Sequence, residues 1–361
     1  MKTMKKYLLI LLIALLALTL GACSGSRRVA ATGWSEITLK EDVAYFSYGP
    51  QVYALNIKTG TQKWLFPTET ETGVDFYAAP VFADDGTQLI VASYDSNLYS
   101  IDPTNGRENW TFTAAENRYV AAPLVTDQGI FAPASDNKLY SVDLNGMPLW
   151  EPFETEDPIW ASPAWSESCG CIYLVSMDHF LYAINPETGS QVWKSEDLGG
   201  PIVSRPAVSD SGLIIISTFN NEVIALDEVK HTIEWRFNTS DWAWASPVID
   251  GEQVYVSDLS GTFYTLDLAT GNLLWQLAPG GKIVSAPLVQ DDLIYFSTDA
   301  SSLVVVSKDG VVQRNLPMEG KLYASPASDG ETLLLAPSEA EYFMIALNPN
   351  GTQIWGYPPA E

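Results

Sequence analysis

The chain repeats one short pattern eight times, and this repetition limits its fold more than any other feature. The clearest copy is Tyr53–Trp64, which has a Tyr-Ala-Leu-Asn start, a Thr-Gly turn and a Trp at its end. A worn copy at Val305–Gly310 lacks the Trp, and the other copies end at Trp110, Trp150, Trp193, Trp235, Trp275 and Trp355. A repeat of roughly 40 residues built from short strands is typical of a β-propeller.

Residues 78–113 illustrate one repeat. Apolar runs at 78–82, 89–93, 98–101 and 109–113 are separated by turns rich in Asp, Asn, Gly and Pro, which predicts four short antiparallel strands. The first strand carries a Pro in all later repeats. Pro cannot donate to a strand ladder, so this strand should be the edge that faces the axis. These residues are Pro80, Pro123, Pro163, Pro206, Pro247, Pro287 and Pro326.

We therefore expect an all-β, eight-bladed propeller of four-stranded antiparallel blades over residues 34–358. The first blade has no Pro marker, and its inner strand is expected near Ser35–Leu39. The alternative is seven blades, with the worn repeat at 303–316 left out of the ring.

A Gly-x-x-x-Trp spacing leads into the fourth strand of most repeats. We expect each indole to lie flat on the peptide of the turn Gly, where a Cβ would clash, and its N–H to bond a carbonyl of a neighbouring blade. These joints should be weaker where Arg314 replaces Trp and where His231 replaces Gly. The blade-docking residues are Trp64, Trp110, Trp150, Trp193, Trp235, Trp275 and Trp355.

The N-terminal residues have the form of an export signal. Three lysines precede the apolar run 7–20, which is short for a membrane span. Leu20–Cys23 then resembles the lipobox of bacterial lipoproteins. We expect a signal peptide at 1–22 and, at 23–33, a lipidated N-terminal Cys23 followed by a flexible tether. The alternative is an ordinary cleaved signal peptide with a chance Cys.

The chain is strongly acidic, with a net charge of −25. Such a surface repels nucleic acid and anionic lipid headgroups, so we expect no nucleic-acid partner and membrane contact only through the lipid anchor. The acidity has two interpretations. It serves solubility or adaptation to salt, or it forms an acidic face that binds a partner.

Few residues are suited to metal or redox chemistry. Cys169 and Cys171 flank one glycine at the start of a predicted strand, and they form either a labile disulfide or two free thiols. His179 and His231 fall in turns of different repeats, so no Cys/His metal site can be assembled and none is expected.

A second pattern precedes each inner-strand Pro. Three residues before it, aromatic residues and Val alternate: Tyr77, Val120, Trp160, Val203, Trp244, Val284 and Tyr323. One residue before it, the side chain is small except at Arg205. The aromatic residues either plug one mouth of the channel or form a pocket for an extended peptide, a sugar or a small aromatic ligand. Arg205 either anchors an anionic group of that ligand or pairs with a carboxylate.

Ala54–Trp64 and Ala183–Trp193 resemble the tryptophan-docking motif of the pyrroloquinoline quinone (PQQ) repeat propellers. The resemblance extends over the chain after the tether and implies their fold, which serves both dehydrogenases and non-catalytic scaffolds. A lipobox followed by one such propeller resembles the BamB-like lipoproteins of the outer-membrane β-barrel assembly machinery. That resemblance implies a non-catalytic monomer within a complex, which docks on the barrel-inserting subunit and helps to deliver unfolded barrel proteins. By this resemblance the protein would be anchored in the outer membrane and face the periplasm. In an organism without an outer membrane, it would lie on the outer face of the plasma membrane.

Two other classes of function remain open. Quinoprotein dehydrogenases of this family have a catalytic Asp, Ca²⁺ ligands beside the quinone, usually a vicinal Cys pair, and large insertions. This chain instead has Cys169-Gly170-Cys171 and short repeats. We therefore expect no enzyme and no cofactor, with PQQ and Ca²⁺ only under this alternative. The third class is a surface lipoprotein that binds carbohydrate or peptide.

Overall fold

The computed structural model describes three stretches of the chain: residues 36–70, 73–83 and 86–357. Internal contacts divide the chain into Met1–Ala31 and Thr32–Glu361, and every described residue belongs to the second unit. The expected signal peptide, the lipidated Cys23 and the tether lie outside the described residues. In the described stretches no helix is long and apolar enough to cross a membrane.

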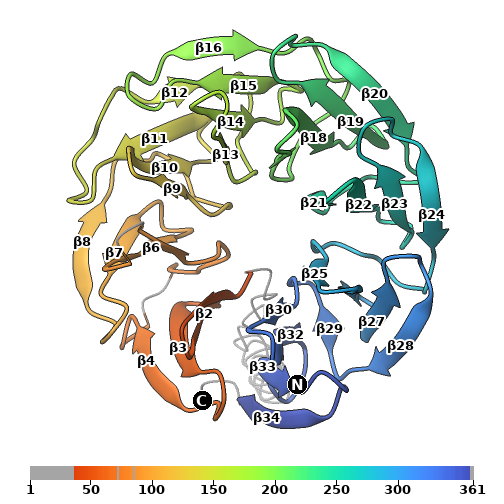
Figure 1. Ribbon diagram of the computed structural model, residues 1–361. Helices are drawn as coiled ribbons and strands as arrows, with labels where there is room; N and C mark the ends of the chain where they lie inside the picture. The colour runs from red at the N-terminus through yellow and green to blue at the C-terminus, as the bar shows by residue number, and fades with distance from the viewer. Residues whose placement is uncertain (1–35, 71–72, 84–85, 358–361) are drawn as a thin grey trace, which may run out of the picture. The chain divides into compact units, whose positions relative to one another are not determined.

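The described residues form eight four-stranded antiparallel sheets, arranged as the blades of a propeller (Figure 1). Within each blade the strands follow one another in chain order, from the axis to the rim. The prediction of an all-β, eight-bladed propeller is confirmed, and the worn repeat is a complete blade, the seventh in the chain.

Blades 1 and 2 comprise β1 (Thr38–Lys40), β2 (Val43–Tyr48), β3 (Gln51–Asn56), β4 (Gln62–Phe66), β5 (Val81–Phe82), β6 (Leu89–Ala92), β7 (Leu98–Ile101) and β8 (Glu108–Phe112). Blades 3 and 4 comprise β9 (Leu124–Thr126), β10 (Gly129–Pro133), β11 (Lys138–Val142), β12 (Phe153–Glu154), β13 (Ala164–Ser166), β14 (Cys171–Val175), β15 (Leu181–Ile184) and β16 (Gln191–Lys194). Blades 5 and 6 comprise β17 (Ala207–Val208), β18 (Leu213–Ser217), β19 (Glu222–Asp227), β20 (Ile233–Asn238), β21 (Val248–Asp250), β22 (Gln253–Ser257), β23 (Phe263–Asp267) and β24 (Leu273–Leu277). Blades 7 and 8 comprise β25 (Leu288–Gln290), β26 (Leu293–Thr298), β27 (Ser302–Ser307), β28 (Val312–Pro317), β30 (Ala327–Ser328), β31 (Leu333–Leu335), β33 (Met344–Leu347) and β34 (Gln353–Tyr357). A small extra sheet pairs β29 (Lys321–Leu322) with β32 (Pro337–Ser338).

The inner-strand prolines stand directly before their strands. β5 begins at Val81, one residue after Pro80, and β17 begins at Ala207, one residue after Pro206. Because the proline nitrogen has no hydrogen to donate, the ladder begins one residue later. The inner strand predicted at 78–82 was therefore too long at its start.

Blade 3 departs from the common pattern at its rim. Its fourth strand, β12, has only two residues and begins after Trp150, although the repeat pattern predicts that Trp150 lies within this strand. Pro148 makes only an isolated bridge to Val142, and Pro152 follows soon after. Two prolines so close together remove the donors that a longer fourth strand would need.

Tryptophans join each blade to the next. The indole of Trp64 lies against Gly106, where an added Cβ would fall 2.8 Å from Cδ2, and its Nε1 donates to the carbonyl of Pro103 at 2.8 Å. Similar hydrogen bonds to the next blade, at 2.8–2.9 Å, are made by Trp110, Trp150, Trp235, Trp275 and Trp355.

The expectation that each indole lies on the Gly of its own repeat is wrong. Gly106 belongs to the repeat after that of Trp64, and the same shift holds around the ring. The reason is that side chains of a strand stand perpendicular to their sheet, so the indole faces the adjacent blade.

Two joints use other residues. At the joint between blades 4 and 5, the imidazole of His231 stacks on Trp193 with ring centroids 4.5 Å apart, and the Trp193 Nε1 donates to no carbonyl of blade 5 among the described residues. At the joint between blades 7 and 8, the guanidinium of Arg314 donates to the carbonyl of Pro349. There Leu316 takes the place of the indole against Gly351.

The ring closes without exchanging strands between its ends. All four strands of blade 1 lie within residues 38–66, and those of blade 8 lie within residues 327–357. Trp355 of blade 8 donates to the carbonyl of Ile57 at 2.8 Å and lies against Gly60 of blade 1. A buried cluster that combines residues of both blades surrounds this joint.

Removing the closing indole should destabilise the propeller. We expect Trp355→Ala to lower the free energy of unfolding by about 3 kcal/mol, because it removes a large packed side chain and one hydrogen bond. Urea denaturation followed by circular dichroism measures the change. Ile354→Ala is the matched control, since Ile354 is on the same strand and 48% exposed; it should change the free energy by less than about 0.5 kcal/mol. Equal values for the two variants would contradict this role.

Candidate functional site: the axial cavity and its mouth

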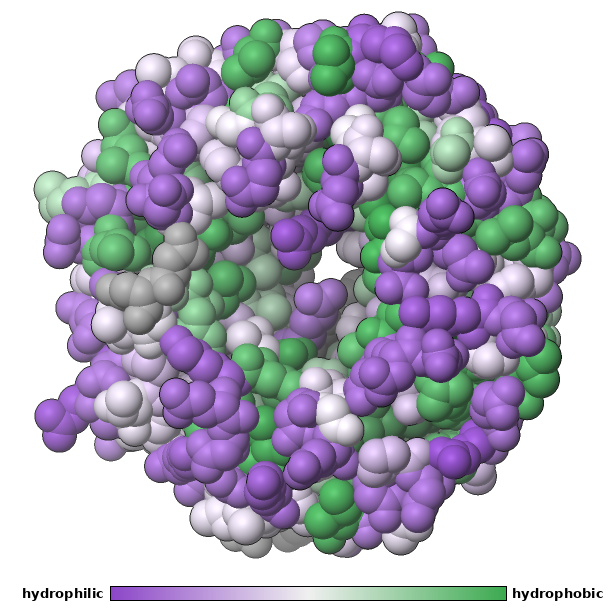
Figure 2. Space-filling model, viewed as in Figure 1, coloured by the Kyte–Doolittle hydropathy of each residue, from purple (hydrophilic) through white to green (hydrophobic). Residues whose placement is uncertain are grey.

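The inner strands and the segments before them enclose a cavity on the propeller axis. Its volume is about 930 Å³, and its walls come from blades 1 to 7. A second cavity of about 120 Å³ shares Glu36, Val203, Ser246 and Ala286 with it. Figure 2 shows an opening at the centre of the ring, bordered by hydrophilic and hydrophobic side chains.

The predicted axial residues are divided between these two cavities. Tyr77, Trp160 and Arg205 line the larger cavity, whereas Trp244 and Tyr323 line the smaller one. All four aromatic side chains are partly buried and Arg205 is exposed. The four aromatic side chains therefore contribute to the walls of these cavities.

Glu36 is a further cavity residue that the sequence pattern did not reveal. Thr38 pairs with Tyr45 in blade 1, and Val81 pairs with Ile90 at the equivalent place in blade 2, so Thr38 and Val81 are equivalent residues. Two residues earlier, Glu36 therefore occupies the position that Ala79 has in blade 2. Arg205 occupies this same position in blade 5, because Ala207 pairs with Ile215 in the same register. The signal was hidden because blade 1 has no inner-strand Pro from which to count.

The carboxyl group of Glu36 experiences two opposing effects. Burial within the ring raises its pKa above the ordinary value, and the guanidinium of Arg205 lowers it. Glu36 nevertheless keeps exposed surface, because it borders the cavity. The two side chains are thus close enough to interact electrostatically, and both line the larger cavity.

Aromatic stacks lead from the cavities to one face of the propeller. Trp242 stacks on Phe219 with ring centroids 4.9 Å apart, and Phe219 stacks on Trp244 at 5.2 Å. Trp242 itself is 46% exposed. In blade 2, Tyr77 packs on Tyr94 with centroids 4.2 Å apart. We call the exposed area around Trp242 the cavity mouth.

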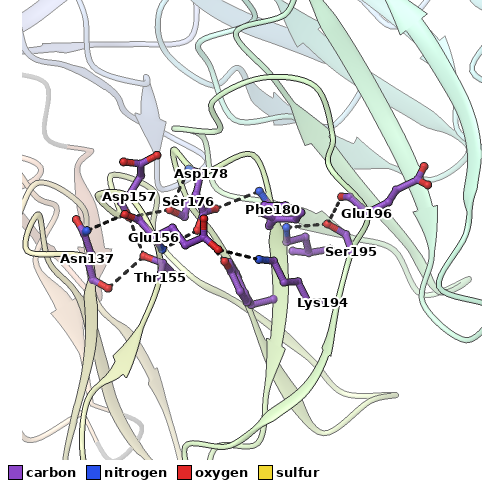
Figure 3. Close-up of polar contacts among 12 residues, drawn as sticks. Asn137, Thr155, Glu156, Asp157, Ser176, Asp178, Phe180, Lys194, Ser195 and Glu196 are labelled. Atoms are coloured by element: carbon purple, nitrogen blue, oxygen red, sulfur yellow. Dashed lines mark hydrogen bonds and ion pairs between the residues drawn. The ribbon is translucent and has the colours of Figure 1, made fainter.

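Carboxylates hold the segments that carry the axial residues. In blade 4 one carboxylate oxygen of Asp178 accepts from the backbone N–H of Glu156 at 3.0 Å and from the hydroxyl of Tyr182 at 2.7 Å. Figure 3 shows Glu156 beside Asp178, with Lys194 nearby over the ring of Phe180. Burial and Asp178 raise the pKa of Tyr182, so its hydroxyl remains a donor.

The same arrangement holds the equivalent segment in other blades. Asp258 accepts from the backbone of Ser240 at 2.9 Å and from Tyr264 at 2.8 Å, and Asp136 accepts from Glu116 and Tyr140. These turn carboxylates therefore have a structural role. They fix the segments that precede Trp160 and Trp244, which line the cavities.

Cys169, Cys171, His179 and His231 line neither cavity. A disulfide joins Cys169 and Cys171, and neither residue lines a cavity. His179 lies 3.4 Å from Asp197, and His231 stacks on Trp193. In the described part of the chain no group of three or more His, Cys, Asp or Glu could hold a metal ion.

Comparison with solved structures supports the fold. The crystal structure of BamB from Moraxella catarrhalis matches with a TM-score of 0.72 and 14% identity, over 88% of this chain and 97% of that chain. At this identity the likeness shows the fold alone.

Sequence relatives include assembly factors and enzymes. The outer membrane protein assembly factor BamB of Nitrosomonas eutropha is 24% identical over 54% of this chain and 50% of its own length. The tetrathionate hydrolase of Acidithiobacillus ferrooxidans is 23% identical over 31% of this chain and 28% of its length. The quinoprotein alcohol dehydrogenase PedH of Pseudomonas putida is 26% identical over 59% and 43%, respectively. The chain thus spans half or less of the length of these relatives.

One family matches along most of the propeller. The family model described as outer membrane protein assembly factor BamB matches residues 48–168, 177–316 and 235–361. Together these segments cover well over half of the chain and include the Gly and Trp residues of nearly every joint. The chain therefore belongs to the outer membrane protein assembly factor BamB family.

Proposed function

We propose that this chain is a non-catalytic, lipid-anchored scaffold that binds other proteins during the assembly of β-barrel proteins into an outer membrane. The observation that carries the proposal is the BamB family match along residues 48–168 and 177–361, because the matched repeats build the propeller itself. Other relatives are enzymes, so the choice between a scaffold and an enzyme has to rest on the residues of the site.

In this proposal the lipid on Cys23 holds the protein at the membrane. The net charge of −25 disfavours binding of the propeller to anionic lipid headgroups, so the anchor supplies the membrane contact. The protein acts as a monomer within a complex, on the periplasmic side of the outer membrane. In an organism with a single membrane it lies on the outer face of that membrane.

The proposed docking surface is the cavity mouth around Trp242. Stacking on Phe219 holds this exposed indole in place before binding, so little side-chain entropy is lost when a partner covers it. Trp is also among the residues that most often dominate the binding energy of protein interfaces. The expected partners are the barrel-inserting subunit and unfolded barrel proteins.

The axial cavities do not fit a quinone with Ca²⁺. Calcium in proteins takes about six to eight oxygen ligands, several of them from carboxylates. Among the described residues that line the two cavities, Glu36 supplies the one carboxylate. The Cys169–Cys171 disulfide also lines neither cavity, so it cannot cover the face of a quinone there. These residues favour the scaffold over the dehydrogenase.

Incubation with PQQ and Ca²⁺ should not produce a quinoprotein. We expect the protein, after removal of free PQQ by gel filtration, to carry no quinone absorbance and to reduce no dye with alcohol substrates, because the cavity lacks the ligands for Ca²⁺. A quinoprotein dehydrogenase reconstituted in parallel is the positive control. A bound chromophore with alcohol-dependent dye reduction would establish the rival function instead.

Capture from native membranes tests the scaffold directly. We expect the lipidated protein, cross-linked in its own membrane, to retain the barrel-inserting subunit, identified by mass spectrometry. Trp242→Ala should reduce the recovered subunit by about tenfold or more, because it removes an exposed aromatic anchor.

Leu274→Ala is the matched control for this capture. Leu274 is 48% exposed and lies on β24 at the rim, so its loss should leave recovery unchanged. Recovery of proteins without any barrel-assembly component would overturn the proposed function. Equal recovery by the two variants would overturn only the docking surface.

A further inference from the structure

One joint of the ring uses a buried carboxylate where most others use an indole hydrogen bond. At the joint between blades 5 and 6, Trp235 donates to the carbonyl of Leu268, which stands three residues before the turn glycine. At the joint between blades 4 and 5 the same position belongs to Glu228, three residues before His231. There the imidazole of His231 stacks on the indole of Trp193, and no described carbonyl of blade 5 accepts from that indole. This joint must therefore be held in another way.

The side chain of Glu228 supplies the joint with a different set of hydrogen bonds. One carboxylate oxygen accepts from the hydroxyls of Ser166 and Tyr173, the latter at 3.0 Å, and the other accepts from the hydroxyl of Ser168. All three donors belong to blade 4, whereas Glu228 belongs to blade 5 and is only 5% exposed. Burial and the neighbouring carboxylate raise the pKa of Tyr173, so its hydroxyl remains a donor. The buried oxygens of Glu228 thus depend on blade 4 for their hydrogen bonds.

Two of these donors lie in a turn that a disulfide closes. The turn joins β13 to β14, and the Cys169–Cys171 disulfide spans a single residue, Gly170. Within it the backbone N–H of Cys169 donates to the hydroxyl oxygen of Ser166 at 3.2 Å, and that of Gly170 donates to the Ser166 carbonyl at 2.9 Å. Ser168 directly precedes the disulfide. The positions of both serine hydroxyls beneath the carboxylate therefore depend on the shape of the disulfide-bonded turn.

The disulfide can be reached from solvent at one of its two sulfurs. Cys169 is exposed, whereas Cys171 is 1% exposed and belongs to the buried strand β14. A Cβ placed on Gly170 between them would meet no atom within 4 Å, so the outer side of the turn is open. An incoming thiolate can therefore approach Cys169, and Cys171 is the sulfur that leaves.

We propose that Cys169–Cys171 is a thiol–disulfide exchange site whose oxidised form holds the joint between blades 4 and 5 together through Glu228. The substrate class is a dithiol, which is either a small molecule or a protein with two neighbouring cysteines. The inference goes beyond the scaffold role and does not depend on it.

The exchange is a two-electron reduction of the site. One thiolate of the dithiol forms a bond to the Sγ of Cys169, the bond to the Sγ of Cys171 breaks, and that sulfur takes the electron pair and a proton from water. The second thiolate of the dithiol then attacks the first sulfur of the same dithiol, which releases Cys169 as a thiol. The site gains two electrons and two protons, and the dithiol becomes a disulfide.

Reduction should loosen the joint. Without the disulfide, the turn loses the covalent constraint that places the hydroxyls of Ser166 and Ser168, and Glu228 is left with fewer donors. A buried carboxylate oxygen without a donor is unfavourable, so water has to enter between the blades. Among the described residues, no carbonyl of blade 5 accepts from the indole of Trp193 to hold the two blades meanwhile.

Thiol labelling tests the exchange itself. The full-length protein in detergent is incubated under native conditions with dithiothreitol, a small dithiol, or with reduced thioredoxin, a protein dithiol. Alkylation and mass spectrometry then locate free thiols, and we expect dithiothreitol to release both Cys169 and Cys171 without unfolding. Reduction by thioredoxin as well would show that a protein dithiol reaches the site, whereas reduction by dithiothreitol alone would limit the source to small molecules.

Hydrogen exchange followed by mass spectrometry tests the effect on the joint. After reduction we expect the amides of turns 166–171 and 227–232 to exchange at least about tenfold faster, because the hydrogen bonds that join the two turns are lost. The equivalent turn 267–272 of blade 6 is the internal control, since its joint uses the indole of Trp235. Its exchange should stay unchanged, and reoxidation should restore slow exchange in the other two turns.

A variant of the acceptor links the two turns. Glu228→Ala keeps the disulfide but removes the carboxylate, so turn 227–232 should exchange rapidly before reduction and change by less than about twofold after it. The matched control is Glu222→Ala, which removes a carboxylate from the other end of β19, where it pairs with Arg236. This control should keep the full response of the wild-type protein to reduction.

Three results would overturn the inference. The first is a disulfide that dithiothreitol reduces only after the protein has been unfolded in urea. The second is a reduced protein whose turn 227–232 exchanges as slowly as in the oxidised form. The third is a Glu228→Ala variant that responds to reduction like the wild-type protein. Circular dichroism of each form excludes global unfolding as the reason for faster exchange, and capture of the barrel-inserting subunit is measured separately, so failure here leaves the scaffold role intact.

Discussion

The structure depends on one contact repeated around a ring, an indole that lies on the turn glycine of the next blade and donates to a carbonyl beside it. This contact combines burial of a large aromatic surface with a hydrogen bond whose direction allows only one arrangement of two blades. It is also what closes the ring, because blades 1 and 8 exchange no strand. The propeller is therefore held by its rim and by the buried faces between blades.

A ring held at its rim leaves its centre free to vary. The inner strands are short, their ladders begin after a proline, and small residues surround the axis. Four residues differ from the type that most repeats carry at the same position. At the rim, Arg314 and His231 replace the usual residues and still contact the neighbouring blade. At the axis, Glu36 and Arg205 stand where the other blades carry Ala or Ser, and both line the larger cavity.

Neither the family nor the turn carboxylates point to an enzymatic site in the described part of the chain. The chain belongs to the BamB family, whose fold also serves enzymes, so the fold alone does not define the function. The carboxylates of the described turns hold loops and tyrosines, as Asp178 and Asp258 do, and are not gathered into a metal site. What the propeller offers is an exposed indole at the cavity mouth and an axial cavity whose lining includes Glu36 and Arg205.

The sequence by itself determined the all-β class, the propeller repeat and the positions of most strands, because these depend on local patterns of apolar, turn and proline residues that recur in register. That the worn repeat completes an eighth blade was decided by the structure. It also identified Tyr77, Trp160, Trp244, Tyr323 and Arg205 as axial residues, since each could be counted from a nearby proline. Only the tertiary structure decided which glycine each indole covers and which residue faces Arg205. Those pairings join different blades, and blade 1 has no proline to set its register. They follow from the closure of the ring, a constraint that no single repeat contains.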